Sequence, residues 1–387
     1  MSKPQKILVI GASLAGPAVC YWLKKFGFTP TLIEKNKEIR QGGYAIDIRG
    51  IAVDIVKQMG IYEQICDRRT RLVSGRYVDA LGNTLHEEQG ESFGFRQGED
   101  VEIVRGDLVE VLMQKIEDIP CYFNQNIDDI TQHSDYVEVH FKEGKTERYD
   151  LVIGADGLHS SIRQMLFAQE YQRVNLGSYI SVFSVPNYLN LAHSGILFEK
   201  QEKSIHLSSD KNPERAHVGF MFRSQKVLSN RSTEKEQQDF LRETFQDLGW
   251  EANKLLELMQ YSDDFYFDAI EQIKMASWTK GRVALVGDSG YCASPLSGQG
   301  TSLAIVGAYL LAGELKAAGE DYSQAFTCYN ELLRPFVKAN QDFGAWVSES
   351  FLLPNNVSKE IAEKRAAQVL EKLQIASRAI DLPFYLL

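Results

Sequence analysis

The feature that most constrains this chain is a run of about 30 residues near its start, in which a strand, a glycine turn, a helix and a second strand follow one another. The first strand is the apolar, β-branched stretch Lys6–Ile10. The turn is Gly11–Gly16, and apolar residues then recur at helical spacing over Pro17–Phe26. A second apolar stretch, Thr29–Ile33, closes the unit. This order predicts a βαβ unit in a parallel, Rossmann-like sheet.

The same turn predicts a dinucleotide-binding site. A pyrophosphate needs close approach of the backbone and free amides at a helix N-terminus. Gly11 permits the tight turn and Gly16 lets the helix pack on the strand, while Ser13 replaces a glycine that usually gives the phosphates room. An acid at Glu34 suits the ribose of FAD or NAD and disfavours a 2′-phosphate. A glycine turn with no ligand is the alternative. The predicted contacts here are Gly11, Ser13, Leu14, Ala15, Gly16, Glu34 and Lys35.

A motif in the second half of the chain carries more information. An apolar strand, Arg282–Val286, ends in Gly287-Asp288, and a glycine-rich turn over Pro295–Gly300 then opens a long apolar helix over Thr301–Ala318. The acid suits sugar or ribityl hydroxyls, and the helix start aims amides and a positive dipole end at one point. A reduced flavin, negative near its N1, suits that point. A packing turn before a core helix is the alternative. The predicted contacts are Gly287, Asp288, Pro295, Gly298, Gln299, Gly300 and Thr301.

Two further motifs are weaker by themselves. The strand Asp150–Gly154 ends in a turn that carries Asp156, which is also common at ordinary strand ends. Arg105 opens a helical pattern and can reach a phosphate or a flavin ring. Most arginines are exposed, so a surface residue at a helix start is the alternative.

The middle of the chain has a different texture. Four stretches between about 176 and 225 are typical of antiparallel strands with polar turns, and helical patterns follow over Thr233–Leu248 and Asn253–Met259. One further strand is expected over Glu147–Ile153. The fold class predicted is α/β with an α+β insert: a Rossmann-like domain, a β-rich layer and a C-terminal helix.

Composition excludes several classes of function. The net charge of -10 disfavours a nucleic-acid partner. Five cysteines without a CxxC pair predict a reducing, cytoplasmic setting with no disulfide frame, and the scattered histidines predict no metal site. The uncharged run Ile7–Leu23 resembles a signal peptide, but Gly11, Gly16 and Pro17 interrupt it and no cleavage site follows. We found no other stretch long enough to span a membrane.

Taken together, the motifs resemble those of the class A flavoprotein monooxygenases of the aromatic-hydroxylase type. The family's dinucleotide fingerprint matches Gly11–Gly16 with Glu34, its Asp-Gly motif matches Gly154–Gly157, and its Gly-Asp motif matches Gly287-Asp288 with the turn Pro295–Gly300. The resemblance covers roughly residues 5–340, and the Gly-Asp motif is specific. Ser13 departs from the fingerprint and leaves the phosphate contact there in doubt.

Within that family the chain is most similar to the tetracycline destructases. The segments Arg40–Asp47 and Ser262–Asp268 and the extra C-terminal helix carry this similarity. It implies that NADPH reduces FAD, that O2 adds to give a flavin C4a-hydroperoxide, and that a phenol or enol such as a tetracycline takes up the oxygen. It also implies that Arg40 lies near the NADPH. The FAD contacts implied beyond the two glycine turns are Asp47, Arg49, Arg105 and Asp156.

The resemblance also divides the chain. It implies an FAD-binding domain over 1–73, 96–177 and 268–320, a substrate-binding domain over 74–95 and 178–267, and C-terminal bridging helices over 321–387 that cap the entrance. Candidate substrate contacts are Phe183, Phe220, Met221, Phe222, Arg223, Pro295 and Gly298. For the aromatic residues and Met221, a place in the core is the more frequent outcome, because half of each strand faces inward.

The last helix, expected from Ser358 to about Arg378, has an apolar stripe that needs a partner surface, as do the terminal residues Leu382, Phe384, Tyr385, Leu386 and Leu387. Docking on the chain's own domains, as a monomer, is the prediction, and a dimer contact is the alternative. The stripe consists of Ile361, Ala362, Val369, Leu370, Leu373 and Ile375.

Three other functions remain open. The same motifs serve monooxygenases of other phenolic substrates and flavin-dependent reductases that use no oxygen. A protein that only binds a flavin or sequesters a ligand is the third.

Overall fold

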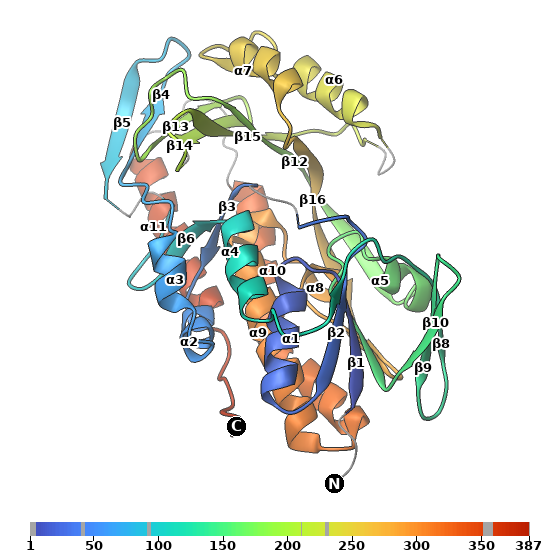
Figure 1. Cartoon of the computed structure of the whole chain (residues 1–387). Coiled ribbons are helices and arrows are strands. Elements are labelled where there is room, and N and C mark those ends of the chain that lie inside the picture. The colour runs from blue at the N-terminus through green and yellow to red at the C-terminus, as the bar shows by residue number, and fades with distance from the viewer. Residues whose placement is uncertain are drawn as a thin grey trace.

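A computed structural model describes residues 5–39, 43–90, 94–209, 211–228, 232–350 and 359–386. Two large sheets dominate the chain (Figure 1). A mostly parallel sheet with long helices forms the lower part of the view, and a larger, mostly antiparallel sheet lies above it. The α/β fold class with a β-rich insert is confirmed.

The lower sheet has six strands in the order β17-β18-β11-β1-β2-β7. The central strand β1 pairs in parallel with β2 and β11, and Ile7, Leu8 and Val9 are fully buried, as expected for a strand covered on both faces. The bounds are β1 Lys6–Ile10, β2 Thr29–Ile33, β7 Cys121–Tyr122, β11 Leu151–Gly154, β17 Thr279–Lys280 and β18 Val283–Leu285.

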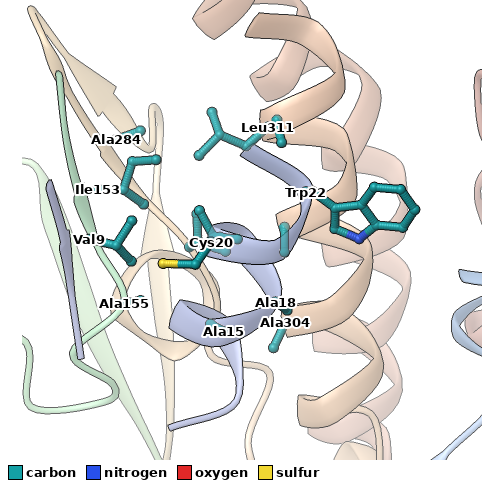
Figure 2. Packing of buried hydrophobic residues seen from close by; sticks show 14 of the residues in the cluster. Val9, Ala15, Ala18, Cys20, Trp22, Ile153, Ala155, Ala284, Ala304 and Leu311 are labelled. Atoms are coloured by element: carbon teal, nitrogen blue, oxygen red, sulfur yellow. The ribbon is translucent and has the colours of Figure 1, made fainter. Parts of the chain in front are cut away.

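Two helices pack beside this sheet. Helix α1, Ala15–Lys25, follows the first glycine turn, and α9, Gly300–Ala318, follows the second. Figure 2 shows Val9, Ile153 and Ala284 of the sheet facing Cys20 of α1 and Leu311 of α9. The expectation that no other stretch is long enough to span a membrane is wrong for α9: among the described residues this one helix is long and apolar enough, although 83% of its apolar window is buried inside the protein.

The upper sheet has seven strands in the order β16-β12-β15-β14-β13-β4-β5. Its neighbours are antiparallel except for β13 and β4, which run parallel. The bounds are β4 Ser74–Val78, β5 Thr84–Gln89, β12 Tyr171–Pro186, β13 Ser194–Lys200, β14 Lys203–Ser209, β15 Arg215–Arg223 and β16 Tyr266–Met275.

Helices α6 and α7 cover one face of the upper sheet (Figure 1). Residues of β15 alternate between buried and half-buried, so that Phe220 and Phe222 pack into the core with α6 and α7 while Met221 and Arg223 face the other side. We refer to that other side as the inner face. The bounds are α6 Glu234–Phe245 and α7 Ala252–Leu258.

Smaller elements complete the described chain. They include a three-stranded sheet, β8 Ile127–Gln132, β9 Val137–Phe141 and β10 Thr146–Tyr149, and a pair, β3 Ala45–Ile48 and β6 Val101–Val104. The helices are α2 Ile51–Gln58, α3 Tyr62–Asp67, α4 Arg105–Gln114, α5 Ser161–Leu166 and α8 Asp288–Tyr291, with short 3₁₀ helices at Met259–Tyr261 and Pro295–Ser297.

The sequence prediction of one strand over 147–153 is wrong. The chain changes direction at Asp150, whose side chain accepts a hydrogen bond from the backbone N–H of Lys6 at 2.6 Å. β10 before this point pairs with β9, whereas β11 after it pairs with β1. The expected domain division stays a prediction: β12 runs through its boundary at 177, where Gly177 has φ +75° and the pairing register shifts.

Two helices end the described chain. The long α10, Tyr322–Ser350, contacts α11, Lys359–Ser377, through Phe343, Val347, Leu373 and Ala376. This confirms docking of the last helix on its own chain. The assignment of Ile375 to the buried stripe is wrong, because it is 64% exposed, and the expected covering of Phe384 and Leu386 is wrong for the same reason. The side chains of Ile361 and Ala362 lie outside the described part.

Candidate active site

The first glycine turn is closed by the chain's own backbone. A Cβ added at Gly11, whose φ is +107°, would lie 2.5 Å from the carbonyl oxygen of Ala155. A Cβ at Gly16 would lie 1.9 Å from the carbonyl oxygen of Gly11. Both distances are far shorter than any real contact, so both glycines are required for the fold itself. Leu14 and Ala15 then lead the chain into α1.

Ser13 and Arg105, from two separate motifs, meet in the structure. The guanidinium Nη2 of Arg105, the first residue of α4, donates a hydrogen bond to Oγ of Ser13 at 2.6 Å. The backbone N–H of Arg105 donates to the carbonyl oxygen of Tyr44 at 3.1 Å. A positive charge is thereby fixed beside the N-terminus of α1, where a helix already favours an anion.

Glu34 lies at the same end of the sheet. Its Oε2 accepts a hydrogen bond from the backbone N–H of Ala12 at 2.9 Å, and its Oε1 accepts from the backbone N–H of Asn36 at 3.0 Å. The carboxylate is therefore held against the glycine turn at the end of β2, where an acid can bind ribose hydroxyls. Lys35 next to it is exposed.

The second glycine turn differs because it faces open space. A Cβ added at Gly298 or at Gly300 would meet no heavy atom within 4 Å in the described part of the chain. Between them, Gln299 is fully buried, and neither atom of its side-chain amide has a hydrogen-bond partner among the described residues. A buried amide without partners is costly, so this one indicates that the amide bonds to a ligand group held beside the open glycines. Thr301 follows as a buried residue of α9.

Asp288 lies between the two turns. A Cβ at the preceding Gly287 would lie 3.2 Å from Cβ of Ala15, which places the end of β18 against the start of α1. Burial raises the pKa of Asp288, and the thiol of Cys292 and the charge of Arg105 only partly offset that rise. The carboxyl is thus poorly solvated, and hydrogen bonds from a ligand would stabilise its charge.

These residues fit a flavin dinucleotide. The structure brings together a carboxylate suited to ribose, an arginine at a helix N-terminus suited to phosphate, and a buried acid suited to a polyol chain. The partnerless amide of Gln299 and the open glycines add a place for a flat ring. The four sequence motifs converge although they are spread over some 290 residues of the chain.

The match to known proteins agrees with this site. Residues 5–343 match the family described as FAD binding domain. The chain belongs to that family. A flavin-dependent monooxygenase from Legionella longbeachae serogroup 1 is 60% identical over 386 residues, which cover 100% of this chain and 99% of the relative. The chain is therefore an FAD-dependent monooxygenase.

Solved structures extend the similarity over the whole chain. The tetracycline destructase Tet(55) is 58% identical, with a TM-score of 0.94 and full coverage of both chains. The tetracycline destructase Tet(51) is 57% identical, with a TM-score of 0.92 and coverage of 99% of this chain and 100% of that one. The class A resemblance and its destructase branch are thus confirmed for this monooxygenase.

The remaining predicted FAD contacts are arranged differently. Asp156 uses both carboxylate oxygens at the start of α5, where they accept hydrogen bonds from the hydroxyl of Ser160 at 2.5 Å and from the backbone N–H of Ser161 at 2.7 Å. Its contact with FAD stays a prediction, and this local bonding gives it a structural role as well. Arg40 lies outside the described residues.

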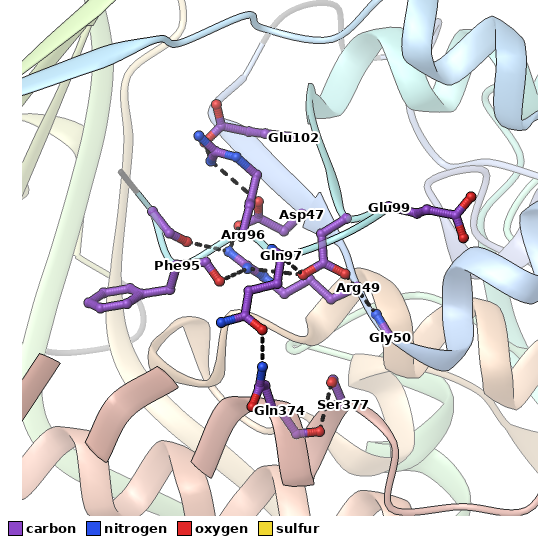
Figure 3. A network of polar contacts seen from close by, with 12 residues as sticks. Asp47, Arg49, Gly50, Phe95, Arg96, Gln97, Glu99, Glu102, Gln374 and Ser377 are labelled. Carbon is purple, nitrogen blue, oxygen red and sulfur yellow. Dashed lines mark hydrogen bonds and ion pairs between the residues drawn. The ribbon is translucent and has the colours of Figure 1, made fainter. Parts of the chain in front are cut away.

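Asp47 and Arg49 belong to a buried ionic network (Figure 3). Arg49 Nη2 lies 2.7 Å from Asp47, and the guanidinium donates to the carbonyl oxygens of Gly94 and Phe95 at 2.7 and 2.8 Å. Arg96 lies 2.9 Å from Glu102. The loop over 94–100 is thereby fixed on β3 and β6, and Gln374 of α11 donates a hydrogen bond to Gln97 of this loop.

The predicted substrate residues separate into two groups. Phe183, Phe220 and Phe222 are fully buried in the core that the upper sheet shares with α6 and α7. Their rings point away from the inner face, so they are not carried forward as substrate contacts. Met221 and Arg223 face inward and stay candidates, although Arg223 also donates a hydrogen bond to the carbonyl oxygen of Ser348 at the end of α10.

Sequence analysis missed Tyr44 and Tyr266 as site residues. Their rings are 6.0 Å apart, and Tyr44 is bonded through its backbone to Arg105. Burial raises the pKa of Tyr44, and the positive charge of Arg105 lowers it in part. Both residues lie in segments that carry the destructase resemblance, and two tyrosines near predicted flavin contacts were the available signal.

Proposed function

We propose that this monooxygenase inactivates tetracycline antibiotics by transferring one oxygen atom from O2 to them, with NADPH as electron donor. The observation that carries the proposal is the full-length match to two solved tetracycline destructases, which includes the terminal helix. The proposal goes further than the family assignment, because the same fold is found with unrelated substrates. For example, the Klebsiella pneumoniae HpxO structure with FAD and uric acid is only 20% identical and shares the fold alone.

The chain's residues would hold FAD from both glycine turns. Glu34 would accept hydrogen bonds from the ribose hydroxyls, and Arg105 with the start of α1 would bind phosphate. Asp288 would bind the ribityl chain, and Gln299 would bind the edge of the ring. When bound, the flavin supplies the electrons and the activated oxygen, and the protein supplies position and electrostatics.

The start of α9 has a further electrostatic role in this proposal. Its N-terminus lies at the open turn Gly298–Gly300, and the positive dipole end stabilises negative charge on a bound ring. The inner face of the upper sheet, with Met221 and Arg223, would form the opposite wall for the substrate. Helix α11 would cover the entrance, since it is anchored to the 94–100 loop.

The deciding experiment follows tetracycline in air with NADPH and the FAD-loaded enzyme. We expect loss of the near-ultraviolet absorbance of tetracycline and a product that gains one oxygen atom by mass spectrometry. NADH in place of NADPH and an anaerobic sample are the matched controls.

Each alternative gives a different outcome. Oxygenation of simple phenols without conversion of tetracycline would make the chain a general aromatic hydroxylase. Substrate-dependent NADPH oxidation that continues without O2 would make it a reductase. No stimulation of NADPH oxidation by any phenol or tetracycline would leave only a binding protein and would overturn the proposal.

A further inference from the structure

One residue beside the second glycine turn has a backbone conformation that serine rarely adopts. Ser294, directly before Pro295, has φ +76° and ψ +156°, in a region that is populated almost only by glycine. The other described non-glycine residues with positive φ have values between +47° and +60°, close to the ordinary left-handed range. Ser294 is also buried, so this strained conformation lies inside the packed protein.

Two buried glutamines hold the chain just before Ser294. Nε2 of Gln272 on β16 donates a hydrogen bond to the carbonyl oxygen of Ala293 at 3.2 Å. Nε2 of Gln341 on α10 donates a hydrogen bond to the carbonyl oxygen of Cys292 at 3.2 Å. Gln272 also donates to the backbone carbonyl oxygen of Gln341 at 2.6 Å, which joins the two residues. We call Gln272 and Gln341 the glutamine clamp.

The clamp acts on the peptide unit that sets φ of Ser294. The carbonyl oxygen of Ala293 and the backbone nitrogen of Ser294 belong to one planar peptide unit, so a bond that fixes this oxygen also fixes φ of Ser294. Helix α10 leaves space for the same oxygen, because a Cβ added at Gly344 would lie 2.6 Å from it. Strained conformations persist only where their surroundings determine them. Here β16 and α10 do so together.

The second glycine turn is built on the carbonyl group of Ser294. Its oxygen accepts hydrogen bonds from the backbone N–H and from the hydroxyl of Ser297, at 3.2 and 2.9 Å. Oγ of Ser297 in turn accepts a hydrogen bond from the backbone N–H of Gln299 at 3.2 Å. The direction of the carbonyl group at Ser294 therefore determines where Gln299 and the open glycines beside it lie.

We propose that Gln272 and Gln341 are positioning residues for the flavin: by keeping Ser294 strained, they hold the turn Pro295–Gly300 in its binding conformation before FAD binds. This inference rests on the proposed function only for the place of the flavin ring, and not for the substrate. Its geometric basis is the carbonyl oxygen of Ala293, which Gln272 holds. Without the clamp Ser294 relaxes, and FAD binding must then restore the strained conformation.

Core packing is the competing explanation for the two glutamines. Both are buried, and the loss of either leaves carbonyl oxygens without a donor, which destabilises the protein whatever the turn does. Glycine at position 294 separates the two roles. It adopts φ +76° without strain, so it makes the clamp unnecessary for the turn, but it does not replace the lost hydrogen bonds.

The test compares FAD affinity in single and double variants, by flavin fluorescence titration of the FAD-free proteins. We expect Gln272→Met to bind FAD about 5- to 150-fold more weakly than the native protein, the range that corresponds to one strained residue. Adding Ser294→Gly should restore the affinity to within about twofold of that of Ser294→Gly alone. The matched control adds Ser294→Ala instead, and should stay weak because alanine is as strained as serine at this φ.

Unfolding of the FAD-free proteins gives a second measurement. Ser294→Gly should raise the free energy of unfolding more in the native chain than in Gln272→Met, because only the native chain holds the strain that glycine relieves. An equal effect of Ser294→Gly in both chains would contradict the clamp. Gln341→Met should behave as Gln272→Met does, and it replaces that variant if Gln272→Met does not fold.

Three results of the titration would overturn the proposal. These are native FAD affinity in Gln272→Met, equal weakness of the glycine and alanine double variants, and restoration by both. If Gly300→Ala keeps native FAD affinity, the flavin ring does not lie at this turn and the clamp fails with that placement. If tetracycline gains no oxygen atom, the proposed function fails separately, since no substrate enters these measurements.

Discussion

The two glycine turns, Gly11–Gly16 and Pro295–Gly300, look alike in sequence and differ in structure. Each opens a helix at the edge of the parallel sheet. In the first, added Cβ atoms would collide with main-chain oxygens. In the second, Cβ atoms at Gly298 and Gly300 would meet nothing within 4 Å among the described residues.

This difference shows that one type of motif serves two purposes. The glycines of the first turn let backbone segments pack against each other, which the fold needs even without a ligand. The glycines of the second turn are not required by packing and leave room for a ligand. A turn of the first kind therefore gives weak evidence of binding, and a turn of the second kind beside the buried amide of Gln299 gives strong evidence.

The largest expected effect is a difference in the free energy of unfolding between a variant of the first turn and a variant of the second. Gly16→Ala places a methyl group 1.9 Å from a carbonyl oxygen, so the backbone must shift. We expect the FAD-free protein to lose more than about 3 kcal/mol in its free energy of unfolding, the upper part of the range for overpacking. Gly300→Ala should raise that free energy by at most about 1 kcal/mol, because alanine favours the helix start. Chemical denaturation of the FAD-free proteins measures both.

For FAD binding we expect the opposite pattern: the variant that keeps its stability, Gly300→Ala, should lose affinity. Gly300→Ala fills the open turn, and we expect FAD to bind about tenfold more weakly or worse, equivalent to about 1.4 kcal/mol. Flavin fluorescence titration of the FAD-free protein measures this. If Gly300→Ala destabilised the protein and left FAD affinity unchanged, the two turns would not differ as the structure indicates.

An effect smaller than the loss of stability in Gly16→Ala concerns Asp288, which lies between the two turns. Asp288→Asn should weaken FAD binding by about 10- to 100-fold, since hydrogen bonds to a charged group contribute about 1.5–3 kcal/mol. The FAD-free variant should nevertheless be more stable than the native protein at neutral pH. The reason is that burial raises the pKa of Asp288, so its ionised form is costly.

The direction of the pKa shift of Asp288 determines how this stability difference changes with pH. A carboxyl whose pKa is raised by folding favours the folded state below its unfolded pKa of about 3.9 and loses that contribution as the pH rises through the folded pKa. The stability advantage of Asp288→Asn should therefore shrink as the pH is lowered from about 8 towards about 4. A constant advantage across this range would mean that ionisation of Asp288 is not its source.

The parts of the fold that follow from local pattern could be predicted. The βαβ unit, the β-rich layer and the helix α9 have continuous or alternating apolar stretches bounded by turn residues. The break at Asp150 could not, because it depends on which sheet each half pairs with. The exposure of Ile375 likewise depends on where α11 meets α10.

For the site, motif residues were easier to predict than pocket walls. Glu34, Arg105 and Asp288 occupy positions set by local turns, and they converge in the structure. Phe220 and Phe222 belong to an apolar strand whose composition is also typical of a pocket wall. Which face of that strand α6 and α7 cover is a tertiary fact that no local pattern carries.

The smallest expected effect tests the one departure in the first turn. Ser13→Ala removes the oxygen that accepts the hydrogen bond from Arg105 at 2.6 Å. Ser13→Gly removes the same oxygen and also gives the phosphates the room found in the usual fingerprint. We expect both variants to bind FAD more weakly by about 0.5–1.5 kcal/mol, which corresponds to a loss of affinity of up to about tenfold.

Equal losses in the two Ser13 variants would mean that the hydroxyl holds Arg105 in place and that space is not limiting in this turn. Flavin fluorescence titration of both FAD-free proteins decides it, with thermal unfolding to confirm that they fold alike. Tighter binding of FAD by Ser13→Gly than by the native protein would contradict the expectation that space is not limiting in the first turn. The first turn would then limit ligand room just as the second one provides it, and the contrast between the two turns would be one of degree.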